Sequence, residues 1–142
     1  QLADCQAVLL YDPVRAVIAN VHAGWRGSTK NILAACIQRM QADFSCDPAD
    51  IRAAISPSLG PCCAEFIRYR EEIPQQYWSY RDSRNRFHFW AISRDQLSGA
   101  GISPEHIECS GICTKCNEHL FFSYRKSSST GRFAAVIRLA AG

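Results

Sequence analysis

Two apolar segments near the start of the chain have the pattern of neighbouring β-strands. Residues 7–11 and 16–21 are almost continuously apolar, and the turn-forming pair Asp12 and Pro13 lies between them. Short runs without polar alternation are typical of strands that are covered on both faces. The pattern therefore predicts two buried strands joined by a tight turn.

The next segment has the periodicity of a helix that packs on a sheet. Its apolar side chains recur on one face, at Ile32, Leu33, Cys36, Ile37 and Met40. Ser28 or Thr29 is the expected N-cap, because hydroxyl side chains accept the first free backbone N–H groups of a helix. We expect this helix to end near Cys46, before Pro48.

Weaker patterns divide the remainder of the chain. They predict a strand at 51–55, an irregular Pro- and Gly-rich loop at 56–61, a weak helix at 65–80, an amphipathic helix at 91–100, and strands at 105–110 and 133–139. Alternating strands and helices favour a mixed α/β (α+β) layered sandwich, without fixing the strand order. With 142 residues and no repeat, we expect a single domain over 1–142. Because the sequence opens on an apolar run, we also expect it to lack an N-terminal segment of a longer protein.

Composition and charge narrow the function classes. Sixteen Lys and Arg against thirteen Asp and Glu give a net charge of +3, too small and too scattered to favour nucleic-acid binding. There is no apolar run of about 18 residues and no leader, so we expect no membrane association and a cytoplasmic location. The eight cysteines make up less than the roughly 8–10% typical of small disulfide scaffolds. Mostly reduced thiols are expected, with an oxidised, stapled domain as the alternative.

The first candidate site is the pair formed by Cys5 and His22. If the two strands pair through the tight turn, position 5 lies opposite position 20 or 21, so both side chains come to one end of the sheet. A thiolate and an imidazole there could hold zinc or form a nucleophile and base pair. The alternative is a small buried thiol beside a core histidine that bonds to backbone.

A glycine-flanked segment follows His22. Gly24 and Gly27 enclose Trp25 and Arg26 just before the predicted helix, so backbone N–H groups and the Arg26 guanidinium could bind an anion. No Walker or dinucleotide-binding motif is present. The alternative is a glycine-lined turn with Trp25 in the core.

Two further patterns lie near the end of the chain. The spacing of Cys113 and Cys116 could supply half of a zinc ribbon, but the adjacent pair Cys62-Cys63 is a poor second half, so structural zinc is not favoured here. The aromatic run 121–125 ends in Tyr124 and Arg125, which could stack on a base or hold an oxyanion. The alternative is a strand with its phenylalanines in the core.

Six motifs occur together in the order of one known family. They are Ala3-Asp4-Cys5, His22-Ala23-Gly24-Trp25-Arg26-Gly27, Gly60-Pro61-Cys62-Cys63, Cys113-Thr114-Lys115-Cys116-Asn117, Phe121-Phe122-Ser123-Tyr124-Arg125 and Thr130-Gly131-Arg132. The chain resembles the YfiH or laccase-domain family, also described as multi-copper polyphenol oxidases and as bacterial purine nucleoside phosphorylases. The resemblance runs from Ala3 to Leu139.

The resemblance implies a zinc site held by two histidines and a cysteine. Cys5 and His22 match two of these ligands, and the third matches a histidine upstream of the first residue given. Copper is the less favoured metal, because a laccase-type cluster needs many more His and Cys ligands than this chain has.

The resemblance also implies an activity. Family members are described as converting adenosine, inosine and methylthioadenosine with phosphate to the free base and ribose 1-phosphate, and as deaminating adenosine. Arg26 and Arg125 are then expected to hold phosphate, with Tyr124 beside the substrate. Asp4 is expected to orient the ligand Cys5 or to act as a general base, and a homodimer is compatible with this function.

Three other functions stay open at this point. Cys5 and His22 would look the same in a cysteine hydrolase, from which a zinc chelator distinguishes a metal enzyme. The family has also been linked to editing of peptidoglycan precursors. A catalytically incomplete interaction domain is the third alternative.

Overall fold

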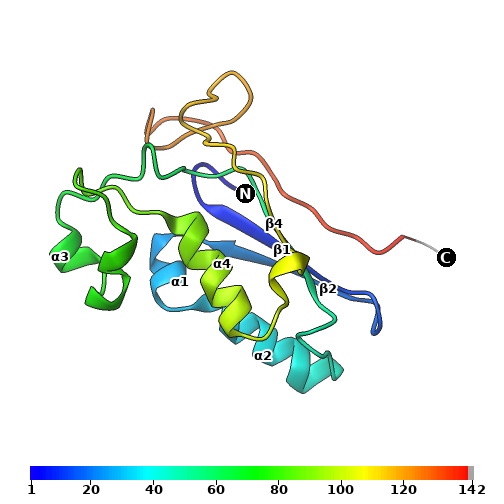
Figure 1. Ribbon diagram of the computed structural model, residues 1–142. Helices are drawn as coiled ribbons and strands as arrows, with labels where there is room; N and C mark the ends of the chain where they lie inside the picture. The colour runs from blue at the N-terminus through cyan, green and yellow to red at the C-terminus, as the bar shows by residue number, and fades with distance from the viewer. Residues whose placement is uncertain (141–142) are drawn as a thin grey trace.

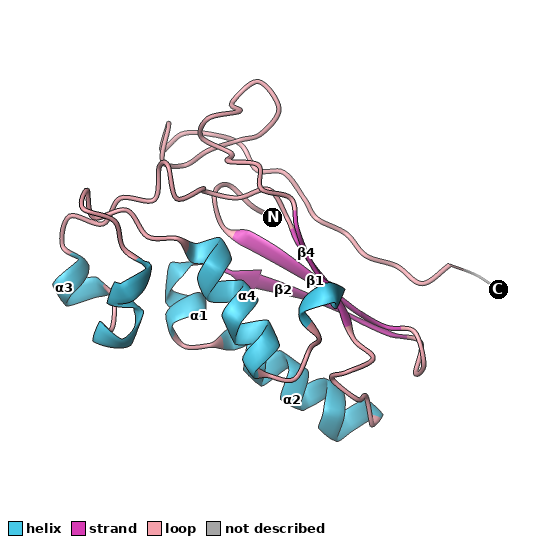
Figure 2. Cartoon of the chain, viewed as in Figure 1, coloured by secondary structure: helices cyan, strands magenta, loops and turns pink. Residues whose placement is uncertain are grey.

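The computed structural model, described here for residues 1–140, is built on one four-stranded sheet (Figures 1 and 2). Its strands are β1 (Gln6–Asp12), β2 (Val17–Ala23), β3 (Arg52–Ile55) and β4 (Ile107–Cys109). The order across the sheet is β2-β1-β3-β4, with β4 parallel to β3 and the other neighbours antiparallel. Because β3 and β4 are parallel, the loops that follow them leave the sheet at the same edge.

The β1–β2 hairpin confirms the first two predicted strands but not their register. Asp12 accepts hydrogen bonds from the backbone N–H groups of Val14 and Arg15 at 2.8 and 2.9 Å, so the turn is centred beyond Pro13. The register pairs Gln6 with Ala23. The expectation that position 5 faces position 20 or 21 is therefore wrong, because four residues separate the strands instead of a tight turn at 12–13.

Three helices cover one face of the sheet (Figure 1). They are α1 (Trp25–Thr29), α2 (Ile32–Phe44) and α4 (Phe89–Gly99). The main core lies between these helices and the sheet, and its fully buried members include Val8, Leu10, Leu33, Ile37 and Leu97. Leu33, Ile37 and Met40 make the predicted apolar stripe of α2.

The N-cap of this helix is Asn31, so the prediction of Ser28 or Thr29 is wrong. Asn31 adopts a left-handed conformation with φ of 54° and its side chain accepts from the Ala34 N–H. Asparagine tolerates this backbone region. The left-handed conformation at Asn31 separates α1 from α2. Ser28 and Thr29 belong instead to the short α1.

The opposite face of the sheet is covered by the C-terminal segment, which runs past the strands as an extended chain (Figure 1). The predicted strand at 133–139 is wrong: among the described residues this segment makes only a single bridge, between Leu2 and Phe133. Its hold on the sheet comes from side chains, as where Asn20 donates to the Ala135 carbonyl. β2 is an edge strand and is only partly buried, so the expectation of two covered faces does not hold for it.

A second, aromatic core lies beside the first. The predicted helix at 65–80 is split by Pro74 into α3 (Tyr69–Glu72) and the 3₁₀ helix η1 (Gln75–Tyr80). Phe66, Tyr69 and Phe87 are buried here, with ring centroids 5.9–6.0 Å apart where Phe87 meets the other two. A second 3₁₀ helix, η2 (Pro104–His106), leads into β4.

The mixed α/β class with layered sheet and helices is confirmed. No helix within residues 1–140 has both the length and the apolar character to cross a membrane.

Candidate functional site

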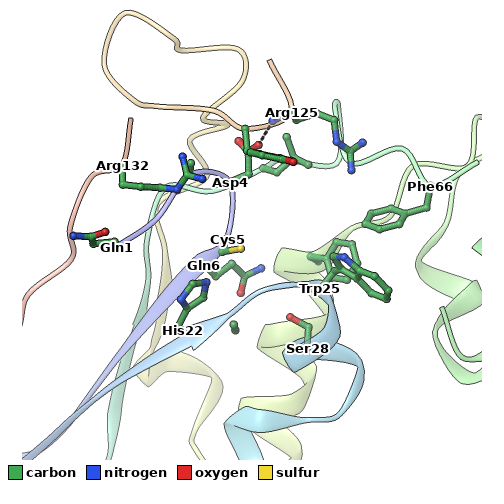
Figure 3. Close-up of a pocket in the computed structure, with 15 residues that line it drawn as sticks. Gln1, Asp4, Cys5, Gln6, His22, Trp25, Ser28, Phe66, Arg125 and Arg132 are labelled. Carbon is green, nitrogen blue, oxygen red and sulfur yellow. Dashed lines mark hydrogen bonds between the residues drawn. The ribbon is translucent and has the colours of Figure 1, made fainter. Parts of the chain in front are cut away.

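A pocket of about 380 Å³ opens where β1 begins and β2 ends (Figure 3). Its wall combines side chains from five segments that are separated in sequence, within 1–6, 22–28, 59–66, 124–132 and at position 89. The lining residues are Gln1, Ala3, Asp4, Cys5, Gln6, His22, Ala23, Trp25, Ser28, Leu59, Phe66, Phe89, Tyr124, Arg125 and Arg132. The sheet end, α1, the loop after β3, the start of α4 and the C-terminal loops therefore build one site.

Cys5 and His22 both line this pocket, as the sequence predicts. Cys5 immediately precedes β1, and His22 is the penultimate residue of β2, paired with Ala7. Val21 and Ala23 are buried under the helices, so the alternation of the strand places the exposed His22 on the other face. Despite the wrong register, the two side chains lie at the same end of the sheet (Figure 3).

The Cys5 thiol is half-buried, and its surroundings favour the protonated form. Burial raises its pKa, the negative charge of Asp4 raises it further, and the positive charge of Arg132 lowers it in part. A thiol in this state is a weak nucleophile unless a cation stabilises its thiolate. Gly24 approaches it so closely that a Cβ there would lie 3.1 Å from the Cys5 Sγ. A larger residue would therefore displace the thiol.

Asp4 holds the rim of the pocket together. One carboxylate oxygen accepts from the Thr114 hydroxyl at 2.7 Å, and the other accepts from the Arg125 backbone N–H at 2.6 Å. Its own carbonyl accepts from the Leu59 N–H at 2.8 Å. Asp4 has a φ of 81°, a conformation that non-glycine residues rarely adopt. Each carboxylate oxygen therefore accepts one hydrogen bond from a residue of the loop at 110–125.

One wall of the pocket is aromatic. The Phe66 ring contacts Trp25 edge-on at 5.7 Å between centroids and Phe89 at 5.5 Å. Tyr124 lies at the rim and is 56% exposed, so its ring is open to a ligand. The composition of the loop 56–66 does not reveal Phe66 as a pocket residue, because only the fold brings it opposite Trp25.

The arginines differ from the sequence prediction. Arg125 lines the pocket, but its guanidinium also donates to the Glu65 carbonyl at 2.6 Å. Arg26 is exposed and does not line the pocket; its guanidinium lies 4.1 Å from the centroid of the Trp25 ring. Arg132 does line it and reaches toward Asp4 and Cys5 (Figure 3). Sequence reasoning missed this third arginine as a site residue, although the motif around it had marked its position.

Ser28 is a second residue that the sequence did not single out for the site. It is 1% exposed and lines the pocket, and its hydroxyl has no hydrogen-bond partner among residues 1–140. Buried hydroxyl groups are normally paired, because desolvation without a partner costs free energy. The unpaired hydroxyl therefore marks a place where a ligand can supply the missing bond.

Cys5 and His22 suit zinc by their donor chemistry. Thiolate and imidazole are typical zinc ligands, and a catalytic zinc site has three protein ligands with one open position. Within the described chain, no third histidine, cysteine or carboxylate forms a ligand group of three with these two. They would hold zinc as two members of such a set.

Four other cysteines could hold a metal ion. Cys62, Cys63, Cys113 and Cys116, hereafter the cysteine cluster, have sulfur atoms that all lie within 4.8 Å of one another. The sequence did not favour the adjacent pair Cys62-Cys63 as the partner of Cys113 and Cys116, but the structure brings all four sulfurs together. The loops after β3 and β4 leave the same sheet edge, and they bring the two pairs together.

Known proteins resemble this chain over nearly all of its length. It is 33% identical over 153 residues to the purine nucleoside phosphorylase YlmD of Geobacillus stearothermophilus, a match that covers 95% of this chain and 53% of that protein. It is 30% identical to the YlmD protein of Bacillus subtilis, with coverage of 95% and 52%. The chain thus spans about half the length of the curated relatives it matches.

Solved structures agree in fold. The crystal structure of the hypothetical protein YfiH of Bacillus licheniformis superposes with a TM-score of 0.79 at 35% identity, over 88% of this chain and 50% of that one. The YlmD structure from Geobacillus stearothermophilus gives a TM-score of 0.79 at 32% identity, over 91% and 51%. The family described as multi-copper polyphenol oxidoreductase laccase matches residues 1–140. The resemblance to YfiH proteins is confirmed, and the chain belongs to this laccase-domain family.

Proposed function

We propose that the pocket binds a purine nucleoside and phosphate and catalyses phosphorolysis of the glycosidic bond. The proposal rests on one observation: an aromatic wall, the two arginines Arg125 and Arg132, and the Cys5–His22 pair all line the same pocket. The names of the relatives, purine nucleoside phosphorylases, support the same reaction class.

In this proposal the base stacks on the aromatic wall. Phe66, Trp25 and Tyr124 offer ring surfaces to a planar ligand. The buried Ser28 hydroxyl would bond a polar group of the nucleoside. The volume of about 380 Å³ is within the range of small-molecule sites.

The phosphate would lie toward the arginines. Arg132 supplies positive charge beside Cys5, and Arg125 supplies it at the rim. An oxygen of phosphate would form a bond to the ribose C1′ while the bond from C1′ to the purine nitrogen breaks. The electron pair leaves with the base, which takes up a proton, and ribose 1-phosphate is released.

We further propose that the pocket holds a zinc ion and deaminates adenosine. Zinc held by Cys5 and His22 would supply a Lewis acid that activates water at neutral pH. In deamination, water replaces the amino group at C6 of adenosine and ammonia leaves, which yields inosine. Asp4 keeps Arg125 and the loop that carries Leu59 in place around the reacting groups.

The decisive experiment is a phosphorolysis assay of the purified chain with inosine and phosphate, with ribose 1-phosphate as the readout. Arg132→Gln is expected to raise the KM for phosphate by about ten- to a hundredfold, because a charge-assisted bond contributes about 1.5–3 kcal/mol. Arg138→Gln, an exposed arginine outside the pocket lining, is the matched control. An unchanged KM in Arg132→Gln would remove this residue from the phosphate site.

Two further tests address the other roles. Arg26→Ala separates its predicted phosphate contact from a role limited to covering Trp25, because only the former changes the KM for phosphate. A zinc chelator separates the metal enzyme from a cysteine hydrolase, which would keep its activity. Absence of ribose 1-phosphate from the zinc-loaded chain would contradict the proposed function for this chain.

A further inference from the structure

The cysteine cluster lies outside the pocket described above and joins two loops. Cys62 and Cys63 belong to the loop at 56–66, after β3, and the other two cysteines belong to the loop at 110–125, after β4. The Cys116 sulfur lies 3.5 Å from each of the Cys62 and Cys63 sulfurs. All eight cysteines of the chain, which fall within the described residues, are free thiols. None of the four cluster cysteines lines the pocket.

The sulfur distances match those of a tetrahedral metal centre. Zinc bonds thiolate sulfur at about 2.3 Å, which places the four sulfurs of a tetrahedron about 3.8 Å apart. The cluster has contacts of 3.5 Å and no separation above 4.8 Å. Small side-chain rotations would bring all four to the distances of a single ion.

The surroundings of the cluster also suit a bound cation. Cys113 is buried, and its sulfur accepts the Gly60 backbone N–H at 3.3 Å, the kind of bond that stabilises a ligating thiolate. Cys62 and Cys116 are exposed, so an ion can enter from solvent. Four thiolates at these distances would repel one another, and a divalent cation would neutralise half of their charge.

We propose that the cysteine cluster binds a single zinc ion as a structural tetrathiolate site. Four protein ligands leave no open position, so this site does not take part in the reaction. It is separate from the Cys5–His22 pair, and the inference does not depend on the proposed function.

The proposed ion would fasten the two loops that form the rim of the pocket. Ser58 and Thr114 already connect them through the Thr114 N–H, which donates to the Ser58 carbonyl at 3.0 Å. Arg125, from the second loop, donates to the carbonyl of Glu65 in the first. A crosslink at the cysteines would hold these two loops together, and with them Phe66 and Tyr124, which both line the pocket.

Cobalt substitution tests the site directly. The full chain is prepared under reducing conditions in a Cys5→Ser background, which removes the sulfur ligand of the other candidate site, and is then titrated with Co²⁺. We expect one equivalent to bind with the intense visible bands of tetrahedral cobalt and the thiolate-to-cobalt charge-transfer band. Adding Cys116→Ser should remove these bands, whereas adding Cys36→Ser, a half-buried cysteine of α2, should not.

Either of two results would overturn the proposal: a reduced chain that binds no cobalt, or bands that persist unchanged in Cys116→Ser. Disulfides among the four cysteines would give the first result only if reduction failed, so free thiols are counted in the same sample. Circular dichroism of each variant shows whether it folds. If Cys116→Ser does not fold, Cys62→Ser replaces it, because Cys62 is also an exposed member of the cluster.

The structural role has its own readout. In the Cys5→Ser background, removing zinc with a chelator should lower the midpoint of thermal unfolding and speed proteolytic cleavage within 56–66 and 110–125. The same treatment of the Cys5→Ser/Cys116→Ser variant should change neither. Equal responses of the two proteins would show that the ion, if bound, does not fasten the loops.

Discussion

Ser28 allows the contribution of one unpaired hydroxyl to be measured. Its hydroxyl is buried in the pocket wall without a partner among residues 1–140, so removing it costs the folded chain no hydrogen bond. If a nucleoside supplies the missing partner, Ser28→Ala should raise the KM for nucleoside about fivefold, which corresponds to about 1 kcal/mol. The midpoint of thermal unfolding should stay equal or rise.

Thr29→Val is the control for this substitution. Thr29 follows Ser28 in α1, and its hydroxyl donates to the Arg26 carbonyl instead of lining the pocket. The KM for nucleoside should not change in this variant. A KM that is the same in Ser28→Ala and the parent chain would exclude a bond from this hydroxyl to the substrate.

Asp4 can be tested as a positioning residue against the role of a general base. Asparagine keeps one acceptor for the Arg125 N–H and tolerates the left-handed backbone, whereas alanine provides neither. Asp4→Asn should therefore keep most of kcat, and Asp4→Ala should raise KM severalfold. Steady-state kinetics of phosphorolysis separates the two constants. A general base would lose its activity equally in both variants.

The predictability of the site follows from how each residue is placed. Three pocket residues, Cys5, His22 and Tyr124, belong to short motifs that can be read from the sequence. Phe66 and the pairing of the cysteines depend on contacts between segments far apart in the chain, such as the Cys62–Cys116 contact, which spans 54 positions. No local pattern encodes such a contact.

Elements with strong periodicity were predictable, and those defined by long-range contacts were not. β1, α2 and α4 follow their apolar patterns. The apolar segment at 133–139 does not form a strand because it crosses the face of the sheet, where side chains such as Asn20 meet it, and not a strand edge with free backbone groups. The prediction of the hairpin register was wrong for a local reason, because the Asp12 side chain bonds to the backbone of Val14 and Arg15 and widens the turn.

The loop at 56–66 depends on a glycine for its close approach to α4. A Cβ at Gly60 would lie 2.9 Å from the Cys113 Cβ and 2.9 Å from the ring of Trp90, closer than real Cβ contacts. Gly60→Ala should therefore lower the free energy of unfolding by about 1–3 kcal/mol, the usual effect of overpacking. It should also weaken cobalt binding by the cysteine cluster, because Cys113 has to move.

Gly99→Ala is the matched control for Gly60→Ala. A Cβ at Gly99, the last residue of α4, would meet nothing within 4 Å. Alanine there should be neutral or stabilise the chain by up to about 1 kcal/mol. Urea unfolding of both variants measures the difference. Equal stability of the two variants would show that the loop adapts without strain.

The stability of the whole chain should fall at low pH because of a carboxylate in the turn at 81–86. The Arg86 backbone N–H donates to Asp82 at 2.9 Å and the Arg86 side chain at 2.7 Å, and these bonds lower the pKa of Asp82 to about 2. An unfolded aspartate has a pKa of about 3.9. The stabilisation is therefore complete above about pH 4 and is lost as pH falls toward about 2.

Stability should also fall at high pH, because of Tyr80, which connects η1 to α4. Its hydroxyl donates to Asp95 at 2.5 Å, and this bond, with burial, raises the pKa of Tyr80 to about 12. Because an unfolded tyrosine titrates near pH 10, this contribution is complete below about pH 10 and is lost as pH rises toward about 12.

The midpoint of thermal unfolding, measured across pH, should thus show a plateau between an acid edge and an alkaline edge. Asp82→Asn should flatten only the acid edge and Tyr80→Phe only the alkaline edge, since the groups lie in separate contacts. If either variant changed both edges equally, the pH dependence would arise from overall charge and not from these two hydrogen-bonded groups.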